Sequence, residues 1–206
     1  MTDGYAGYDA VAQENRIIHA GCMVHARRKF TEAIKAQTNN KTGKAHQGLA
    51  FIKKLYAIET ETKNATPEQK YQARQQYSKP IIEQFKIWLE KSSQHVPPKT
   101  LTGKAIHYAL KQWPKLIVFL DHGNVPLDNN CAENVIRPFV IGRKNWIFST
   151  SQRGAKASAN IYSLIQTARA NEIEPFEYLK KVFTDLPIAD SLSGIEKLLP
   201  ISKGVD

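Results

Sequence analysis

The sequence has little cysteine, no long apolar segment and no leader-like start. Its 206 residues include two cysteines, Cys22 and Cys131, too few for a disulfide framework, so we expect two free thiols in a reducing compartment. No apolar run approaches the roughly 20 residues that cross a bilayer. The first residues lack the basic and apolar regions of a secretory signal. These absences predict a cytoplasmic protein without a membrane partner.

Several common catalytic and metal-binding motifs are also missing. The pairs Gly43-Lys44 and Gly103-Lys104 lack the upstream glycine and the following Ser or Thr of a phosphate-binding loop. No Gly-x-Ser-x-Gly sequence occurs, so a serine hydrolase elbow is excluded. Cys22 and His25 have the spacing of zinc ligands, but there is no second pair. A buried cysteine beside a polar histidine is the favoured interpretation.

What the chain does have is an excess of positive charge in two blocks. Apolar residues make up 42% and charged residues 23%, which excludes a disordered or fibrous chain, and the net charge is +10. Residues 25–54 carry eight basic residues against one acidic, and residues 129–170 carry six against one, whereas both ends are acidic. Such clustering predicts a surface that binds a polyanion. For the first block, a solvated helix face is the alternative.

Hydrophobic periodicity in the first 48 residues predicts mixed secondary structure. A short helix is expected over 8–15, and the apolar residues 17–24 are typical of a buried strand. A helix is expected from Ala26 onward, with Phe30, Ala33 and Ile34 on its apolar face. The polar residues 39–48 predict a loop.

The remainder of the chain has helical periodicity. Residues 49–112 are expected to be helical, with Thr66 and Gln69 forming a capping box and Pro80 producing a break or kink. The sequence Asp128-Asn129-Asn130 is typical of a helix start. We expect a short helix there that buries Ala132, Ile136 and Val140 and whose regular length is limited by Pro138. Residues 146–148 are expected to be extended, and helices are expected over 154–170 and 175–186. The chain is expected to fray after Asp190.

Two carboxylates stand out by their context. Glu133 is the one acidic residue among six basic ones in residues 129–170. It could form an ion pair with Arg137, four residues later on the same helix face, or it could be a metal ligand beside a bound phosphate backbone. Asp3 precedes Gly4, where a strand would end if one came before it. Aspartate ligands at strand ends hold the metal ions of phosphoryl-transfer enzymes. Such sites need about three carboxylates. The sequence offers two candidates.

Three separated motifs resemble a known family. They are TDGYAGY at residues 2–8, GCMVHARRKF at residues 21–30, and the stretch that begins LDNNCAENVIRPFVIGRKNW at residue 127 and runs to residue 183. In this order they resemble the C-terminal half of bacterial transposases of the insertion sequence 66 family, in the DDE class. The resemblance extends from Thr2 to about Leu186, with a variable helical middle.

The resemblance implies an α/β, mainly helical fold. Residues 1–25 would be the remnant of a ribonuclease H-like core that lacks its first strands, and residues 26–126 an all-helical insert. Residues 127–170 would carry the glutamate helix and a basic region that closes the core, followed by a C-terminal helix and tail over 171–206. A sheet without its first strands exposes an edge, so we expect the isolated chain to be poorly stable.

The same resemblance implies an activity and its carboxylates. The family performs Mg2+-dependent (or Mn2+-dependent) cleavage of transposon ends and strand transfer into target DNA. Asp3 matches the second aspartate of the DDE triad and Glu133 its glutamate; Asn134 stands where the family usually has Arg. The first aspartate lies upstream of Asp3 in the family, so we expect activity only with an upstream transposase fragment or a second protomer. A non-catalytic DNA-binding fragment or a decayed remnant is the alternative.

Basic residues of the two blocks are the expected DNA contacts. The candidates near the cleaved phosphate are Arg137, Arg143, Lys144, Arg153 and Lys156. Trp146 is expected either to stack on an exposed base or to lie in the core. The motif at residues 21–30 implies that His25, Arg27 and Arg28 face DNA, with plain solvent exposure as the alternative for the two arginines.

Overall fold

The computed structural model describes residues 1–5, 7–14, 17–37, 42–146 and 149–201. Regular structure in that part of the chain is helical, and the one pairing between extended segments is a parallel bridge between Thr2 and Gly21. The chain divides into two compact units, Met1–Cys131 and Ala132–Asp206, which are described separately. The finer division into four parts stays a prediction. No described helix is long and apolar enough to cross a membrane.

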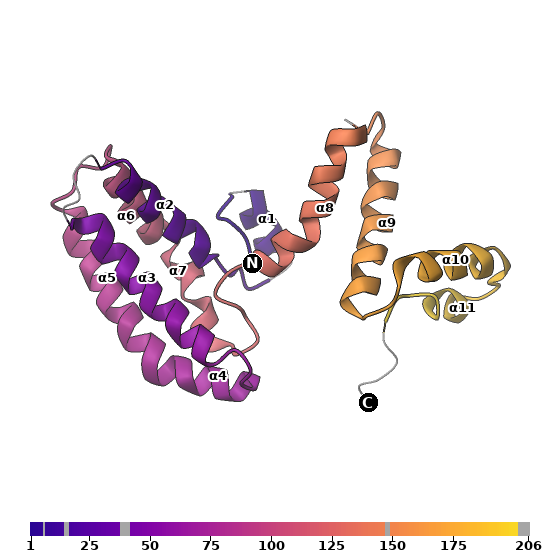
Figure 1. Cartoon of the computed structure of the whole chain (residues 1–206), viewed down its shortest axis with the longest axis horizontal. Helices are drawn as coiled ribbons and strands as arrows, with labels where there is room; N and C mark the ends of the chain where they lie inside the picture. Colours follow the sequence, from indigo (N-terminus) through magenta and orange to yellow (C-terminus); the bar gives the residue numbers. More distant parts are fainter. Residues whose placement is uncertain (6, 15–16, 38–41, 147–148, 202–206) are drawn as a thin grey trace. The chain divides into compact units, whose positions relative to one another are not determined.

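The first unit is built around four long helices. These are α2 (Met23–Lys35), α3 (Lys44–Glu61), α5 (Lys79–Ser93) and α6 (Leu101–Lys111). Helices α2 and α5 each pack against both α3 and α6, so the four enclose one core (Figure 1). The shorter elements are α1 (Gly7–Glu14), α4 (Pro67–Ala73), the π-helical turn η1 (Arg74–Ser78), α7 (Trp113–Leu116) and the 3-10 turn η2 (Val118–Asp121). The predicted helical character of residues 49–112 is confirmed.

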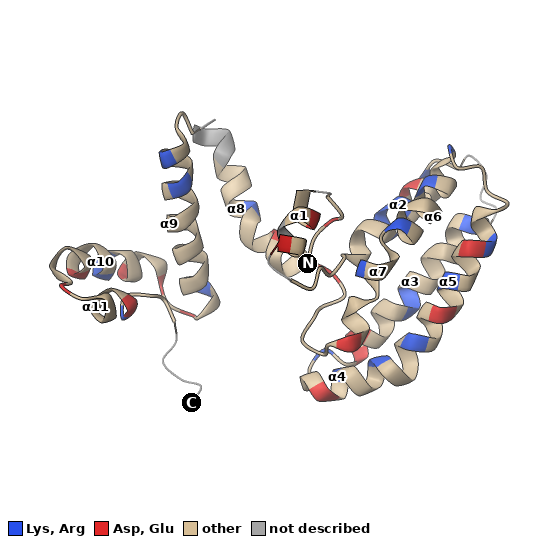
Figure 2. Ribbon diagram, turned by 180° about the vertical axis from the view of Figure 1, so that it is seen from behind, with Lys and Arg blue, Asp and Glu red and all other residues tan. Residues whose placement is uncertain are grey.

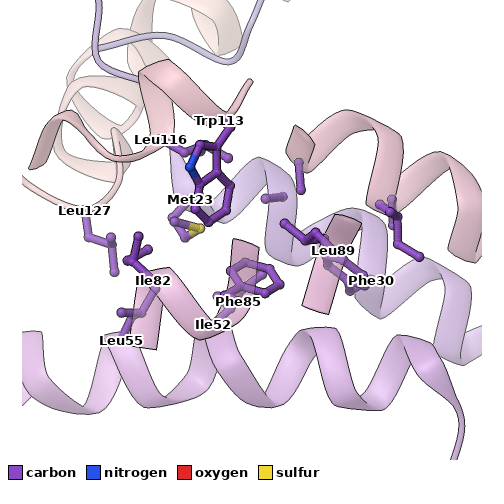
Figure 3. Close-up of a cluster of buried hydrophobic side chains, with 14 of the residues drawn as sticks. Met23, Phe30, Ile52, Leu55, Ile82, Phe85, Leu89, Trp113, Leu116 and Leu127 are labelled. Atoms are coloured by element: carbon purple, nitrogen blue, oxygen red, sulfur yellow. The ribbon is translucent and has the colours of Figure 1, made fainter. Parts of the chain in front are cut away.

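Aromatic and aliphatic side chains from all four long helices fill this core (Figure 3). Phe30, Ile52 and Phe85 are fully buried, and the rings of Phe30 and Phe85 lie 6.3 Å apart. Gly48 lets α2 and α3 approach closely, because a Cβ at this position would lie 2.5 Å from Cε1 of Phe30. The apolar face predicted for the helix from Ala26 is therefore the face that enters the core.

A buried arginine joins the bundle to the turn that follows η2. Arg74 is 2% exposed, and its Nε and Nη2 donate to the carboxylate of Glu59 at 2.8 and 2.6 Å. Its Nη1 donates to the backbone carbonyl oxygens of Phe119, His122 and Val125 at 2.8 to 2.9 Å. Every guanidinium nitrogen thus has a partner, which offsets the cost of burying the charge.

The predicted helix start at Thr66 is confirmed. Its hydroxyl accepts from the backbone N–H of Gln69 at 3.3 Å, and the Gln69 side chain accepts from the N–H of Thr66 at 2.9 Å. Pro80 does not end the helical path, because it lies in the first turn of α5. Proline lacks the N–H that continues an α-helix, and the departure from regular geometry falls in the π-helical turn η1 just before it.

The second unit consists of helices with few buried side chains. It contains α8 (Asn130–Trp146, which starts two residues before the unit boundary), α9 (Gln152–Ala170), α10 (Pro175–Asp185), the 3-10 turn η3 (Leu186–Ile188) and α11 (Leu192–Glu196). Helices α9 and α10 pack together, and the Tyr178 hydroxyl donates to the carbonyl of Leu198 at 3.0 Å. The buried side chains of this unit, within the described residues, are Ala168, Tyr178 and Pro200.

The predicted strand over residues 17–24 is wrong. Ile17 and Ile18 are 58% and 65% exposed, and α2 already begins at Met23. Apolar β-branched residues favour a strand only where a sheet is present to pair with, and the described residues offer one bridge. The helical part of the predicted fold class is confirmed, whereas a ribonuclease H-like sheet is not seen in the described segments. The prediction that the isolated chain is poorly stable assumed an exposed sheet edge, and the described segments contain no sheet to provide one.

Two further predictions need correction. The loop expected over 39–48 is shorter, because α3 begins at Lys44. Helix α8 continues through Pro138 to Trp146. The three residues expected to be buried are all exposed: Ala132, and Ile136 and Val140 at 56% and 53%. Burial depends on a partner surface, which the periodicity of a helix does not report.

The predicted helices near the C-terminus are confirmed to within two residues as α9 and α10. Fraying directly after Asp190 is wrong, because α11 follows and the Ser191 hydroxyl caps it by accepting from Gly194 at 3.2 Å. The extended segment expected over 146–148 falls on the last residue of α8 and on two residues outside the described part.

Candidate functional site

Asp3 lies in a tight turn at the start of the first unit. Its Oδ1 accepts from the backbone N–H of Tyr5 at 3.0 Å, and its side chain is exposed. Gly4 has a φ of 88°, a left-handed conformation that residues with a Cβ avoid. A Cβ there would also lie 2.9 Å from Cδ of Gln112. The pair Asp3-Gly4 therefore presents a carboxylate from a turn that glycine makes possible.

The residue before Asp3 is hydrogen-bonded to the segment that leads into α2. The N–H of Thr2 donates to the carbonyl of Ala20 at 3.0 Å, and the carbonyl of Thr2 accepts from the N–H of Cys22 at 3.1 Å. This is the pattern of a very short parallel ladder. It places Asp3 directly after a paired residue.

The segment that leads into α8 is bound to the same place. The N–H of Met23 donates to the carbonyl of Leu127 at 3.1 Å, and the N–H of Asn129 donates to Sγ of Cys22 at 3.4 Å. Burial raises the pKa of the Cys22 thiol, so it acts here as a neutral acceptor. Three distant parts of the sequence thus meet in the first unit, at residues 20–23.

Tyr108 of α6 links the Asp3 turn to α2. Its hydroxyl donates to the backbone carbonyl of Asp3 at 2.7 Å, and Nζ of Lys29 lies 4.9 Å from the centre of its ring. Burial is the main cause that raises the pKa of Tyr108 to about 12, with smaller contributions from Cys22 and Asp3. The hydroxyl therefore stays protonated and remains a hydrogen-bond donor at neutral pH.

Tyr56 of α3 makes the corresponding link at the start of α8. Its hydroxyl donates to Oδ2 of Asp128 at 2.9 Å, and the guanidinium carbon of Arg27 lies 5.2 Å from its ring centre. The other oxygen of Asp128 accepts from the backbone N–H of Asn130 at 3.1 Å. Burial raises the pKa of Tyr56 well above its usual value. Asp128 therefore supports the first residue of α8, as its predicted capping role requires.

A polar network supports Thr2 from the other side. The Thr2 hydroxyl is hydrogen-bonded to Nε2 of His19, whose Nδ1 lies 3.1 Å from Oδ1 of Asp9. Nζ of Lys115 forms an ion pair with the same oxygen of Asp9. The hydrogen bond from Lys115 is the largest cause that lowers the pKa of Asp9, and burial is the largest cause that lowers the pKa of His19.

Neither this network nor the contacts of the two tyrosines was predicted from the sequence. Tyr56 and Tyr108 are half-buried, and their partners lie 72 and 105 residues away in the sequence. Helical periodicity places each tyrosine near an apolar face but says nothing about the target of its hydroxyl. Only the packing of α2 against α3 and α6 reveals these contacts.

Glu133 lies in the first turn of α8, in the second unit, and its side chain is half-buried. Arg137 follows one turn later and is exposed, as is Asn134. The first turn of a helix is a common place for an acidic side chain, because the positive end of the helix dipole lies there.

The predicted DNA contacts are distributed over both units. Arg27 and Arg28 are exposed on α2, and His25 is half-buried there. In the second unit, the first turns of α9 present Arg153 and Lys156 to solvent. The side chains of Arg143, Lys144 and Trp146 lie outside the described residues.

The carboxylates were tested for their fit to a divalent metal ion. Asp3 and Glu133 carry the oxygen donors that Mg2+ and Mn2+ prefer. However, the described residues contain no group of three or more His, Cys, Asp or Glu side chains that could hold a metal. Asp3 belongs to the first unit and Glu133 to the second. These residues alone do not make a complete metal site, so no reaction step is derived through a metal here.

Comparisons with known proteins agree with the arrangement of motifs. Residues 1–157 match the model of a family described as "Transposase IS66 family", and residues 163–201 match the "IS66 C-terminal element". The chain is 33% identical over 214 residues to "Uncharacterized protein y4hP" of Sinorhizobium fredii (strain NBRC 101917 / NGR234). It is 32% identical over 208 residues to "Uncharacterized protein y4qI" of the same strain.

Both alignments cover 97% of this chain and 38% of the relative. The chain therefore spans about two fifths of the length of these relatives. No solved structure matches the chain.

Proposed function

The chain belongs to the IS66 transposase family, and on that basis we propose that it is the C-terminal part of a DDE transposase. Its reaction would be metal-dependent cleavage of transposon ends and strand transfer into target DNA. Asp3 and Glu133 would be two of the carboxylates that act on the phosphate. At least one further carboxylate is needed, because the described residues contain no cluster of three.

The observation that carries the proposal is the meeting of the family motifs at residues 20–23. Thr2, just before Asp3, and the segment before α8 are both hydrogen-bonded to residues 20–23, which lead into the basic helix α2. Motifs separated by about a hundred residues have no reason to share hydrogen bonds unless the fold brings them together. A site assembled from several chain segments is what phosphoryl-transfer chemistry requires.

The basic residues of the two units suit a DNA substrate. Arg27 and Arg28 in the first unit and Arg137, Arg153 and Lys156 in the second would contact the phosphate backbone. Mg2+ or Mn2+, when bound by the completed set of carboxylates, would stabilise charge on the attacking and leaving oxygens. The completing residues would come from further transposase sequence or from a second protomer.

A chimera tests the proposal. The segment of the y4hP relative that aligns with this chain is replaced by residues 1–206, and the chimera is assayed beside the unaltered relative. The readout is Mg2+- or Mn2+-dependent nicking of DNA that carries the ends of the relative's own element. We expect the chimera to nick, and Asp3→Asn or Glu133→Gln to reduce nicking at least about 100-fold, because each removes a charged metal ligand.

Matched controls remove an exposed carboxylate elsewhere in each unit, Asp121→Asn in the first and Asp190→Asn in the second. Both should leave nicking unchanged. Undiminished nicking by the Glu133→Gln chimera would refute the assignment of that residue. A folded chimera that binds DNA but does not nick, beside an active relative, would favour the alternative of a non-catalytic DNA-binding fragment.

A further inference from the structure

Helices α2 and α6 lie side by side and carry most of the uncompensated charge of the bundle (Figures 1 and 2). Together they hold six basic residues and one acidic residue, Glu32; the basic ones are Arg27, Arg28, Lys29, Lys35, Lys104 and Lys111. Helices α3 and α5 also hold six basic residues, but with four acidic ones. The positive potential of the bundle is therefore concentrated over α2 and α6, which we call the α2–α6 face.

The basic side chains of the α2–α6 face are not neutralised, and two of them are held in place by aromatic rings. None of them takes part in an ion pair among the described residues of the first unit. Arg27 lies over the ring of Tyr56 and Lys29 over the ring of Tyr108, so each flank of α2 rests on an aromatic ring. Ring contacts restrict the side chains and leave their charges available, which reduces the entropy lost on binding an anion.

The dimensions of the face fit double-stranded DNA. Helix α2 has 13 residues and α6 has 11, so α2 is about 20 Å long and α6 about 17 Å. At 3.4 Å per base pair, this length covers about five base pairs. Lys35, Lys104 and Lys111 are exposed along it. Lysine and arginine side chains distributed over this length can contact several phosphates of a duplex.

The face is better suited to the backbone than to bases. Its two tyrosine rings are covered by Lys29 and Arg27, and their hydroxyls already donate to Asp3 and Asp128. Proteins that bind single-stranded DNA stack its bases on aromatic rings, and these two rings are already occupied by cationic side chains. The geometry predicts binding to phosphates without sequence readout, and the contact from Tyr108 places Asp3 at the margin of the face.

We propose that the α2–α6 face is a docking surface for duplex DNA, so that the helical bundle binds DNA as well as supporting the site. This inference rests on the proposed function for the class of partner. It goes beyond it in assigning DNA contact to Lys35, Lys104 and Lys111, which are not among the individual DNA contacts named in the proposed function.

The test measures duplex binding by fluorescence anisotropy, with a random-sequence 30-base-pair duplex at several salt concentrations and the full chain. The variant Lys35→Gln, Lys104→Gln, Lys111→Gln removes three charges from the face. Its matched control removes three lysines of α5, Lys79→Gln, Lys86→Gln, Lys91→Gln, which are all exposed. All six positions are exposed, so both variants should fold, and circular dichroism checks this.

We expect the face variant to bind at least about ten-fold more weakly near 0.1 M salt, and its log–log salt slope to fall by about 0.9 for each lost phosphate contact. The α5 control should change affinity less than about three-fold, which is the effect of net charge alone. Equal losses in the two variants, or no loss in the face variant, would overturn the proposal. Tighter binding to a single strand of the same sequence would overturn the choice of duplex.

A third variant separates this inference from the proposed function. Arg137→Gln, Arg153→Gln, Lys156→Gln removes the candidate contacts of the second unit. Loss of binding in this variant alone would exclude the α2–α6 face and leave the transposase proposal in place. Absence of duplex binding by the unaltered chain would contradict both proposals.

Discussion

Phe85 and Phe183 have the same side chain and opposite surroundings. Phe85, in the first unit, is fully buried and lies within about 6 Å of four other aromatic rings. Phe183, in the second unit, is 65% exposed. The contrast holds for the units as a whole. The first encloses a continuous apolar core, whereas most large apolar side chains of the second contact solvent in the described residues.

Because of this difference, the residues of the proposed site belong to parts of the protein that are stabilised in different ways. Asp3 and the basic residues of α2 are attached to a packed bundle, where burial of apolar surface supplies most of the stability. Glu133, Arg153 and Lys156 are attached to helices that are stabilised mainly by their own hydrogen bonds, their caps and a few packing contacts. Substitutions in the second unit should therefore disturb folding little, and their effects on activity should be easier to interpret.

The largest expected effect is the loss of a ring from the core. Phe85→Ala should lower the free energy of unfolding by about 4 kcal/mol, because it removes a fully buried ring and leaves a cavity beneath Phe30 and Trp113. The same change at Phe183 should cost less than about 1 kcal/mol, because the ring is mostly exposed. Urea unfolding followed by circular dichroism measures both. Equal costs would show that the second unit buries Phe183 in solution.

The next effect compares a buried ion pair with an exposed one. Arg74→Ala should destabilise the first unit by about 3 kcal/mol, because it leaves the carboxylate of Glu59 and three backbone carbonyls without their donor. In the second unit, Lys180 lies 3.8 Å from Glu177, with both side chains about two thirds exposed. Lys180→Ala should therefore change stability by less than about 0.5 kcal/mol.

The same unfolding assay distinguishes these cases. The variant Glu59→Gln provides an internal check, because it keeps the volume of the side chain but removes the charge that Arg74 faces. It should be destabilised less than Arg74→Ala, since the carbonyl partners of the guanidinium remain. A cost for Arg74→Ala no greater than that for Lys180→Ala would contradict the buried pair.

How far the sequence could predict the molecule depended on the range of the interactions. Local signals were reliable: the capping box of Thr66 and the apolar face of α2 are as expected. Errors occurred where the outcome depended on a partner surface. Residues 17–24 have strand-like composition without a sheet to join, and Ile136 lies on an apolar helix face that remains exposed.

For the candidate site, the motifs identified Asp3 and Glu133 but not what surrounds them. The hydroxyl of Tyr108 reaches Asp3 across 105 residues of sequence, and that of Tyr56 reaches Asp128 across 72. Neither contact has a local signature, because each depends on how three helices pack. The roles of the two carboxylates in chemistry stay predictions until the chimera is tested.

The smallest expected effect is a dependence of stability on mildly acidic pH that belongs to the first unit. All six histidines lie before residue 132, and so the second unit has none to titrate. Burial, and then the charge of Lys115, lower the pKa of His19 below its ordinary value of 6.5, and Asp9 offsets this only in part. The folded state therefore favours the neutral imidazole. Stability from this source is complete above pH 6.5 and decreases as the pH falls through 6.5 toward the lower folded pKa.

Urea unfolding at pH 7.5 and pH 5.5 measures this dependence. The chain should be slightly less stable at pH 5.5, and His19→Gln should reduce the difference, because glutamine does not titrate. His95→Gln is the matched control, since His95 is exposed on the same unit and its side chain is hydrogen-bonded to the backbone carbonyl of Lys91. It should preserve the wild-type difference. If His19→Gln kept the full difference instead, the network of Thr2, His19 and Asp9 would not hold a neutral imidazole, and the support it gives to the Asp3 turn would have to be sought elsewhere.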